Sequence, residues 1–230
     1  MFDNKYFGII LIFATFEIGK YINSKVKSPI ANPLLISIGL CILFLKITKI
    51  PYESFKQGGD FIAFFIAPAT VAMVLSLYEN LDELKKNIVP IIGGTLVGSI
   101  FAMLFAIFAF KTLGFDKNIT TSVTPQSITT AIAVSLSGEY GGNTALTAIS
   151  VVIRGVTGAV IAPIIIKIFR IKDPVAQGIG IGTSAHAVGT SEARRIGEIQ
   201  GAMSGLSIAV AGLMTVFLMP IAVSIIEKIF

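Results

Sequence analysis

The chain has 230 residues, of which 54% are hydrophobic and 13% charged, and its formal net charge is +5. Soluble domains carry about 25% charged residues, so this composition and a mean hydropathy of +0.85 indicate an integral membrane protein. The basic residues lie at loop ends and form no basic stripe with interleaved aromatic residues, which gives no support to nucleic-acid binding.

The first apolar segment follows Lys5 and could be mistaken for a signal peptide, but no small-residue cleavage site follows it. We interpret it as a membrane helix. The lone Cys41 supports neither a disulfide framework nor a cysteine metal site. Membrane helices need about 20 apolar residues, and five clear candidates are Tyr6–Ile22, Asn32–Ile47, Asn87–Phe110, Thr144–Lys167 and Ala202–Ile226.

Three further apolar segments are interrupted by proline or glycine and are interpreted as broken or re-entrant half-helices. Thr124-Pro125 and Asp173-Pro174 each place a side-chain acceptor before a proline, which predicts a helix start. Ala67-Pro68 lacks such a cap, so a kink is expected there. The three segments are Phe61–Tyr78, Ser122–Ser137 and Asp173–Gly189.

The predicted fold class is therefore all-α, a polytopic integral membrane protein of about seven or eight helical segments. We expect one transmembrane domain over 1–230, with N-terminal helices in 1–112 and a polar-interrupted half in 117–230. A weak internal repeat, with an offset of about 57 residues, aligns the stretch after Pro125 with that after Gly182. If 173–189 crosses the membrane the repeats are parallel, and if it re-enters they are inverted.

Loop charges give a first estimate of orientation. For eight crossings, one side holds both chain termini and the larger group of basic residues, which favours cytoplasmic termini. That larger group is Lys46, Lys49, Lys56, Lys111, Lys117, Lys167, Arg170 and Lys172, against Lys20, Lys25, Lys27, Lys85, Lys86, Arg194 and Arg195.

The segment 177–195 is the leading candidate for a substrate site. It gathers glycines, hydroxyl groups, the only histidine and three charged residues between two apolar stretches. Polar, irregular backbone at membrane depth is tolerated where protein buries it or where it lines a wet cavity.

Arg154 lies near the middle of a predicted span, where a charge costs about 2.5 to 3.5 kcal/mol. A substrate carboxylate would compensate it through the guanidinium fork. The alternatives are an ion pair with Glu139, Glu192 or Glu198, or a helix register that brings Arg154 closer to the interface.

His186 is surrounded by small residues, Thr183 and Ser184 among them. Because an imidazole changes charge near neutral pH, His186 could bind substrate or carry a proton with it. The alternative is a packed histidine bonded to a backbone carbonyl.

Two polar stretches resemble helix starts that suit an anion. In the first, Thr190 is the cap, Glu192 is a candidate for proton coupling, and Arg194 adds charge. The second runs through Gln126, Ser127 and Thr129; its hydroxyls could instead bond back to their own helix. Glu139 is a weaker candidate proton site, with a solvated loop as the alternative.

Motifs for enzymes and cofactors are missing. The glycines at 178–182 lack the last glycine of a dinucleotide fingerprint, and no G-x-S-x-G elbow is present. One histidine without cysteines does not make an ordinary zinc site. We therefore expect no enzymatic activity, no metal and no cofactor.

The stretches 122–142 and 182–192 resemble the LrgB/CidB family, and the similarity extends over nearly the whole chain. The resemblance implies a multi-pass protein of the inner membrane with a holin-like partner of the LrgA/CidA type, described as modulating murein hydrolases and autolysis. The same pattern occurs in the membrane domain of the plastidial glycolate/glycerate transporter. Family members are associated with pyruvate, glycolate, glycerate or lactate.

These observations lead to two hypotheses. The first is a proton-coupled carrier for small monocarboxylates, in which Arg154 and His186 recognise the charge of the substrate. The second is a holin-like or antiholin-like regulator of autolysis that transports nothing itself. The expected partners are a small anionic metabolite, the holin-like protein and the lipid bilayer, and the sequence leaves homo-oligomerisation open.

Overall fold

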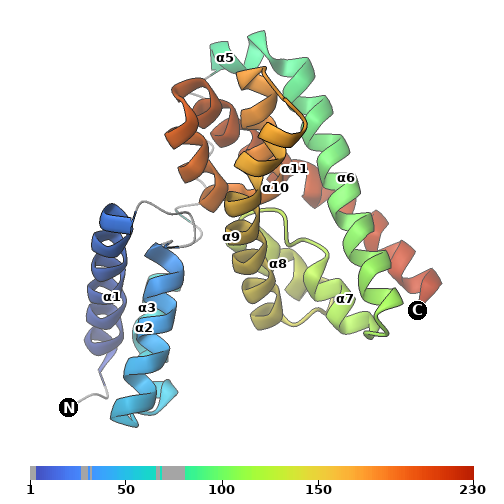
Figure 1. Cartoon of the computed structure of the whole chain (residues 1–230). Helices are drawn as coiled ribbons and strands as arrows, with labels where there is room; N and C mark the ends of the chain where they lie inside the picture. Colours follow the sequence, from blue (N-terminus) through green and yellow to red (C-terminus); the bar gives the residue numbers. More distant parts are fainter. Residues whose placement is uncertain (1–3, 27–30, 32, 66–67, 69–80) are drawn as a thin grey trace. The chain divides into compact units, whose positions relative to one another are not determined.

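The computed structural model describes residues 4–26, 31, 33–65, 68 and 81–230. In this part of the chain all regular secondary structure is helical, which confirms the predicted all-α class (Figure 1). The helices fall into two compact units, 1–69 and 70–230. A single domain over the whole chain stays a prediction.

In the first unit, α1 (Lys5–Val26) packs against α2 (Pro33–Thr48) and against α3 (Tyr52–Ala63). The α1–α2 contact is polar at its centre, where Thr15 Oγ1 lies 2.8 Å from Ser37 Oγ and 3.2 Å from Cys41 Sγ. The α1–α3 contact is a backbone approach, since a Cβ on Gly8 would lie 2.9 Å from Gly58 Cα. The predicted kink at Ala67-Pro68 lies outside the described residues.

The second unit contains all the candidate site residues. Among the described helices, α1, α6, α9 and α11 are long and apolar enough to cross a membrane. This agrees with the polytopic membrane fold expected from hydropathy. The helices of this unit are α5 (Leu81–Lys86), α6 (Ile88–Thr112), α7 (Lys117–Val123), α8 (Thr130–Glu139), α9 (Thr144–Ile168), α10 (Pro174–Ile196) and α11 (Glu198–Ile229).

The α7–α8 segment is a re-entrant hairpin. Asn118 Nδ2, at the start of α7, donates to Gly141 O just beyond α8 over 2.5 Å. Asn143 N donates to Ser122 Oγ over 2.7 Å, so the two ends of the hairpin are bonded together. At its tip, 124–129, the side chains of Thr124, Ser127 and Ile128 are buried inside the unit. The start of α7 and the end of α8 therefore lie at the same end of the unit.

The tip corrects one predicted helix start. Thr124 is the C-cap of α7, and its Oγ1 donates back to Thr120 O over 2.7 Å. This bond to the preceding turn keeps Thr124 in the first half-helix, and α8 begins only at Thr130. The prediction at Asp173-Pro174 is confirmed, because Asp173 accepts from Val175 N and Ala176 N at the start of α10.

Helix α10 is a second re-entrant hairpin. A straight helix of its 23 residues would separate its ends by about 34 Å. Instead Gln177, near its start, accepts a 2.9 Å hydrogen bond from Gln200 Nε2 at the start of α11. The reversal occurs at His186, whose φ of 38° and ψ of −139° interrupt the helix. The segment 173–189 therefore re-enters.

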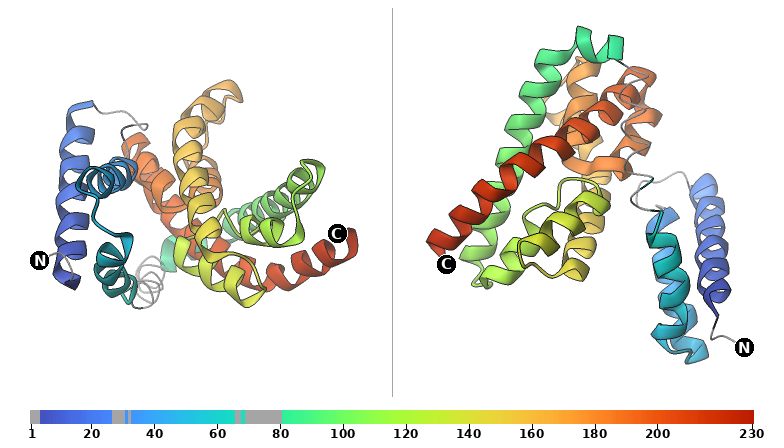
Figure 2. Two further views of the ribbon diagram at one scale, coloured as in Figure 1. Left: turned by 90° about the horizontal axis from the view of Figure 1, so that it is seen from below. Right: turned by 180° about the vertical axis from the view of Figure 1, so that it is seen from behind.

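The two hairpins come from opposite ends of the unit. Helix α9 starts beside α7, where Asn143 N bonds Ser122 Oγ. Helix α11 also ends beside α7, where Lys117 Nζ lies 3.1 Å from Glu227 Oε1. Helices α9 and α11 consequently run in opposite directions, as Figures 1 and 2 show. The offset of 57 places Thr129, before α8, on His186, before the second half of α10. The two halves thus have the inverted arrangement.

Re-entry overturns the eight-crossing charge count, which grouped Lys117 with Lys172. Lys117 lies at the end of the unit where α11 stops, and Lys172 lies at the other, where α9 stops. The second end holds most of the basic residues of this unit, and the positive-inside rule then predicts that this end is cytoplasmic and that the C-terminus lies on the other side of the membrane. The basic residues at that end are Lys85, Lys86, Lys167, Arg170, Lys172, Arg194 and Arg195.

Cysteine labelling tests this topology in a Cys41→Ala background. We expect a thiol at Lys172→Cys and one at Leu113→Cys to react with an impermeant maleimide from opposite sides of the membrane, because one hairpin and one crossing separate them. Labelling of both positions from the same side would contradict re-entry of the α7–α8 segment.

Candidate functional site

The break in α10 is held by the middle of α9. His186 Nε2 lies 2.9 Å from Val151 O, and the ring is 4% exposed. Three residues further along α9, Arg154 Nε donates to Ser184 O over 3.0 Å. Carbonyl groups at the end of a half-helix have lost their helical partners, so the guanidinium satisfies one of them. Both bonds reach from α9 to the residues that flank the break.

A glycine on α9 makes room for the imidazole. A Cβ on Gly155 would lie 2.6 Å from His186 Nε2, closer than side-chain atoms approach. One turn further, a Cβ on Gly158 would lie 3.2 Å from Ala185 Cα. These glycines form a face of α9 that packs against the break in α10.

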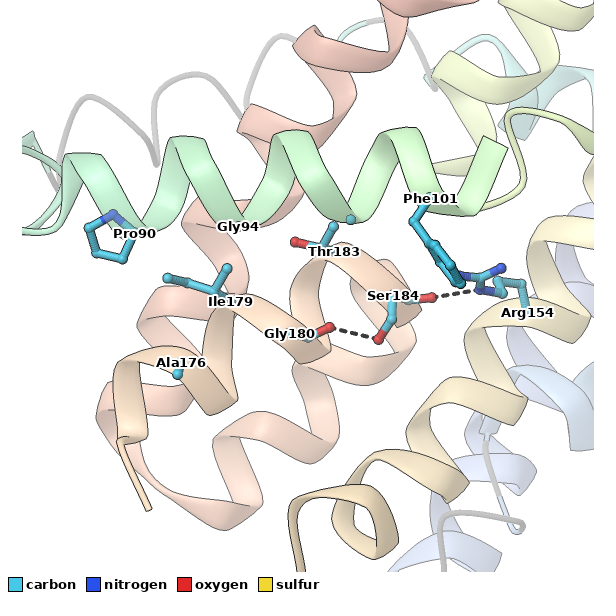
Figure 3. Close-up of a pocket in the computed structure, with 10 residues that line it drawn as sticks. Pro90, Gly94, Phe101, Arg154, Ala176, Ile179, Gly180, Thr183 and Ser184 are labelled. Atoms are coloured by element: carbon cyan, nitrogen blue, oxygen red, sulfur yellow. Dashed lines mark hydrogen bonds between the residues drawn. The ribbon is translucent and has the colours of Figure 1, made fainter. Parts of the chain in front are cut away.

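Beside the break lies a cavity of about 490 Å³ between α6, α9 and α10. Figure 3 shows Arg154 at one end of it and Pro90 at the other, with Phe101 reaching from α6 toward Arg154. Of the predicted site residues, Arg154, Thr183 and Ser184 line this cavity. The structure thus brings the charged residue of α9 and the hydroxyls of α10 to one place.

Arg154 has no acidic partner in the described part of the chain. The alternatives named Glu139, Glu192 and Glu198, and none of them forms an ion pair with Arg154. Glu192 pairs with Arg195 over 2.9 Å. One edge of the half-buried guanidinium is bonded to Ser184 O, which leaves its terminal amino groups to the cavity.

Thr183 carries a second unsatisfied polar group. Its side chain is 5% exposed, and its Oγ1 has no hydrogen-bond partner among the described residues. An unpaired buried hydroxyl costs about 1–3 kcal/mol. Ser184 differs, because its Oγ donates back to Gly180 O over 2.7 Å. A ligand in the cavity would therefore meet one cation, Arg154, whereas the unpaired Thr183 hydroxyl is covered by protein.

Other predicted site residues lie outside this cavity. Gln126, Ser127 and Thr129 belong to the tip of the α7–α8 hairpin, where Thr129 Oγ1 is buried without a partner in the described chain. Glu139 is exposed at the end of α8. Their role in binding stays a prediction.

The predicted helix start at Thr190 is wrong. Thr190 lies inside the second half of α10, which begins at the break, and its Oγ1 donates to His186 O over 3.1 Å. The hydroxyl also bonds Ser204 Oγ over 2.7 Å and so ties α10 to α11. Arg194 is exposed and packs along Gly201. Neither residue lines the cavity.

Sequence reasoning missed the α6 wall of the cavity. Gly94 and Gly98 approach Ile179 and Thr183 closely. They line the cavity as well, together with Phe101. The signal was available in the small residues of α6, whose missing side chains leave space beside a neighbouring helix.

The chain was compared with known proteins. The model of the LrgB-like family matches residues 12–225. The chain belongs to the LrgB-like family. The Antiholin-like protein LrgB of Bacillus subtilis (strain 168) is 35% identical over 222 residues, which cover 96% of each chain. The protein of the same name from Bacillus cereus (strain B4264) is 34% identical over 216 residues, 94% of each.

These names agree better with the regulator hypothesis than with the carrier hypothesis, since they describe antiholin-like proteins. No solved structure matches the chain.

Substitution of Gly155 tests whether the close contact between α9 and His186 stabilises the break in α10. We expect Gly155→Ala to lower the free energy of unfolding by about 1–3 kcal/mol, because the methyl group displaces the imidazole. Gly93→Ala is the matched control: a Cβ there meets nothing within 4 Å, and alanine favours the helix by about 1 kcal/mol. Thermal unfolding in detergent measures the stability of both variants, and equal stability would contradict a stabilising contact between Gly155 and His186.

Proposed function

We propose that the chain acts as an antiholin-like regulator in the cytoplasmic membrane, restraining murein hydrolases and autolysis together with a holin-like partner. Support comes from family membership and from relatives that are aligned over nearly their whole length and carry the antiholin-like name. Helices α6, α9 and α11, which are long enough to span a membrane, fit that location.

Complementation tests the regulator function. In a Bacillus subtilis strain that lacks its own LrgB relative, expression of this chain is expected to slow detergent-induced lysis, because an antiholin opposes membrane permeabilisation by its holin. Turbidity after detergent addition is the measurement. An unchanged lysis rate, with the chain shown to be in the membrane, would contradict the proposal.

The geometry favours a second candidate, a carrier for small monocarboxylates such as pyruvate, glycolate, glycerate or lactate. The observation behind it is Arg154, a guanidinium near the middle of a spanning helix that faces a cavity and has no acidic partner in the described chain. Helix breaks at binding sites are a recurring arrangement in secondary transporters with inverted repeats. Proton coupling through His186 is part of this candidate.

Uptake of labelled pyruvate or glycolate into proteoliposomes tests the carrier. Loss of a buried charge contact costs about 2–5 kcal/mol, so Arg154→Gln is expected to lower uptake by about tenfold or more. Lys167→Gln removes the same charge from the exposed end of α9 and is expected to retain uptake. Equal uptake by the two variants would contradict the site, and uptake that does not saturate would contradict a carrier.

A further inference from the structure

The cavity beside Arg154 is apolar over most of its length. Its α6 wall extends from Pro90 to Phe101, which is about 16 Å along a helix with a rise of 1.5 Å per residue. The opposite wall is the first half of α10, with Ala176, Ile179 and Gly180. In Figure 3 these side chains lie between Pro90 and the polar end.

The polar groups gather at the other end. Arg154 provides the only charged side chain among the lining residues, and Thr183 and Ser184 lie at the same end of the cavity. Ser184 presents a hydroxyl that is already bonded to Gly180 O. One cation at the end of an apolar cavity favours a ligand with a single negative charge and an apolar tail.

The volume is larger than a small acid requires. Cavities that bury small molecules measure about 300–1,000 Å³, and this one, at about 490 Å³, lies within that range. A three-carbon acid bound at Arg154 would leave the stretch between Ile179 and Pro90 unfilled. Burial of an alkyl chain against that apolar wall would add to the binding free energy.

We propose that this cavity binds a free monocarboxylate with an apolar tail, its carboxylate on Arg154 and its tail along Gly94 and Gly180 toward Pro90. Only the anion contact rests on the carrier candidate. The tail contact is independent of it, because different residues form it.

The orientation of the cavity argues for a free acid and against a membrane phospholipid. Arg154 lies near the middle of α9, whereas Pro90 lies near the start of α6, beside the basic end of the unit. A phospholipid keeps its headgroup at the interface, so its phosphate would lie at the Pro90 end. In the cavity the cation lies at the opposite end, near the middle of α9.

Equilibrium binding of labelled octanoate and propanoate to the purified full chain in phosphatidylcholine nanodiscs tests the proposal. Octanoate is expected to bind at least about tenfold more tightly than propanoate, since each buried methylene favours binding. Gly180→Leu is expected to abolish this preference, because a Cβ on Gly180 points into open space and leucine would fill the tail region. Arg154→Gln is expected to weaken binding of both acids.

Gly93→Leu is the matched control, since Gly93 also faces open space but does not line the cavity, and it should bind like the unchanged chain. Thermal unfolding shows that each variant is folded. Equal affinity for the two acids, equal octanoate binding by Gly180→Leu and Gly93→Leu, or displacement of octanoate by phosphatidylglycerol would overturn the proposal. Propanoate binding that depends on Arg154 without a preference for octanoate would remove the tail site and leave the carrier candidate standing.

Discussion

The break at His186 is the constraint on which the second unit depends. A residue with a Cβ at positive φ is strained by about 1–3 kcal/mol and persists only where its surroundings impose it. Here α9 imposes it, since Val151 O bonds the imidazole and Arg154 bonds Ser184 O two residues before the break. The same bonds commit one edge of the guanidinium and direct the remainder to the cavity.

In the inverted arrangement, each long helix packs against the hairpin of the other half. Gly155, on the spanning helix of the first half, admits His186 at the break of the second half. Gly212, on the spanning helix of the second half and 57 residues later, lies against Ile132, just after the break of the first half. Each long helix thus accommodates the other half's hairpin, which is how two buried interruptions share one membrane unit.

Hydropathy predicted the long helices well, because spans such as α9 are set by local composition, and it also indicated which segments are interrupted. The points of interruption depend on tertiary contacts. Asp173 caps its own helix, so that start was predictable, whereas Thr124 is drawn into the preceding helix by its bond to Thr120 O. The break at His186 could not be predicted, because the residues that hold it are more than 30 positions away on α9.

A disulfide test addresses re-entry of α10 most directly. In a Cys41→Ala background, Gln177→Cys and Gln200→Cys place two thiols where the native side chains share a 2.9 Å hydrogen bond. A Cβ on the neighbouring Gly178 would lie 3.1 Å from Gln200 Cα, so the two backbones approach closely here, and mild oxidation in native membranes is expected to give an intramolecular cross-link. If α10 crossed the membrane instead, these positions would lie at opposite faces, and the absence of a cross-link would contradict the account.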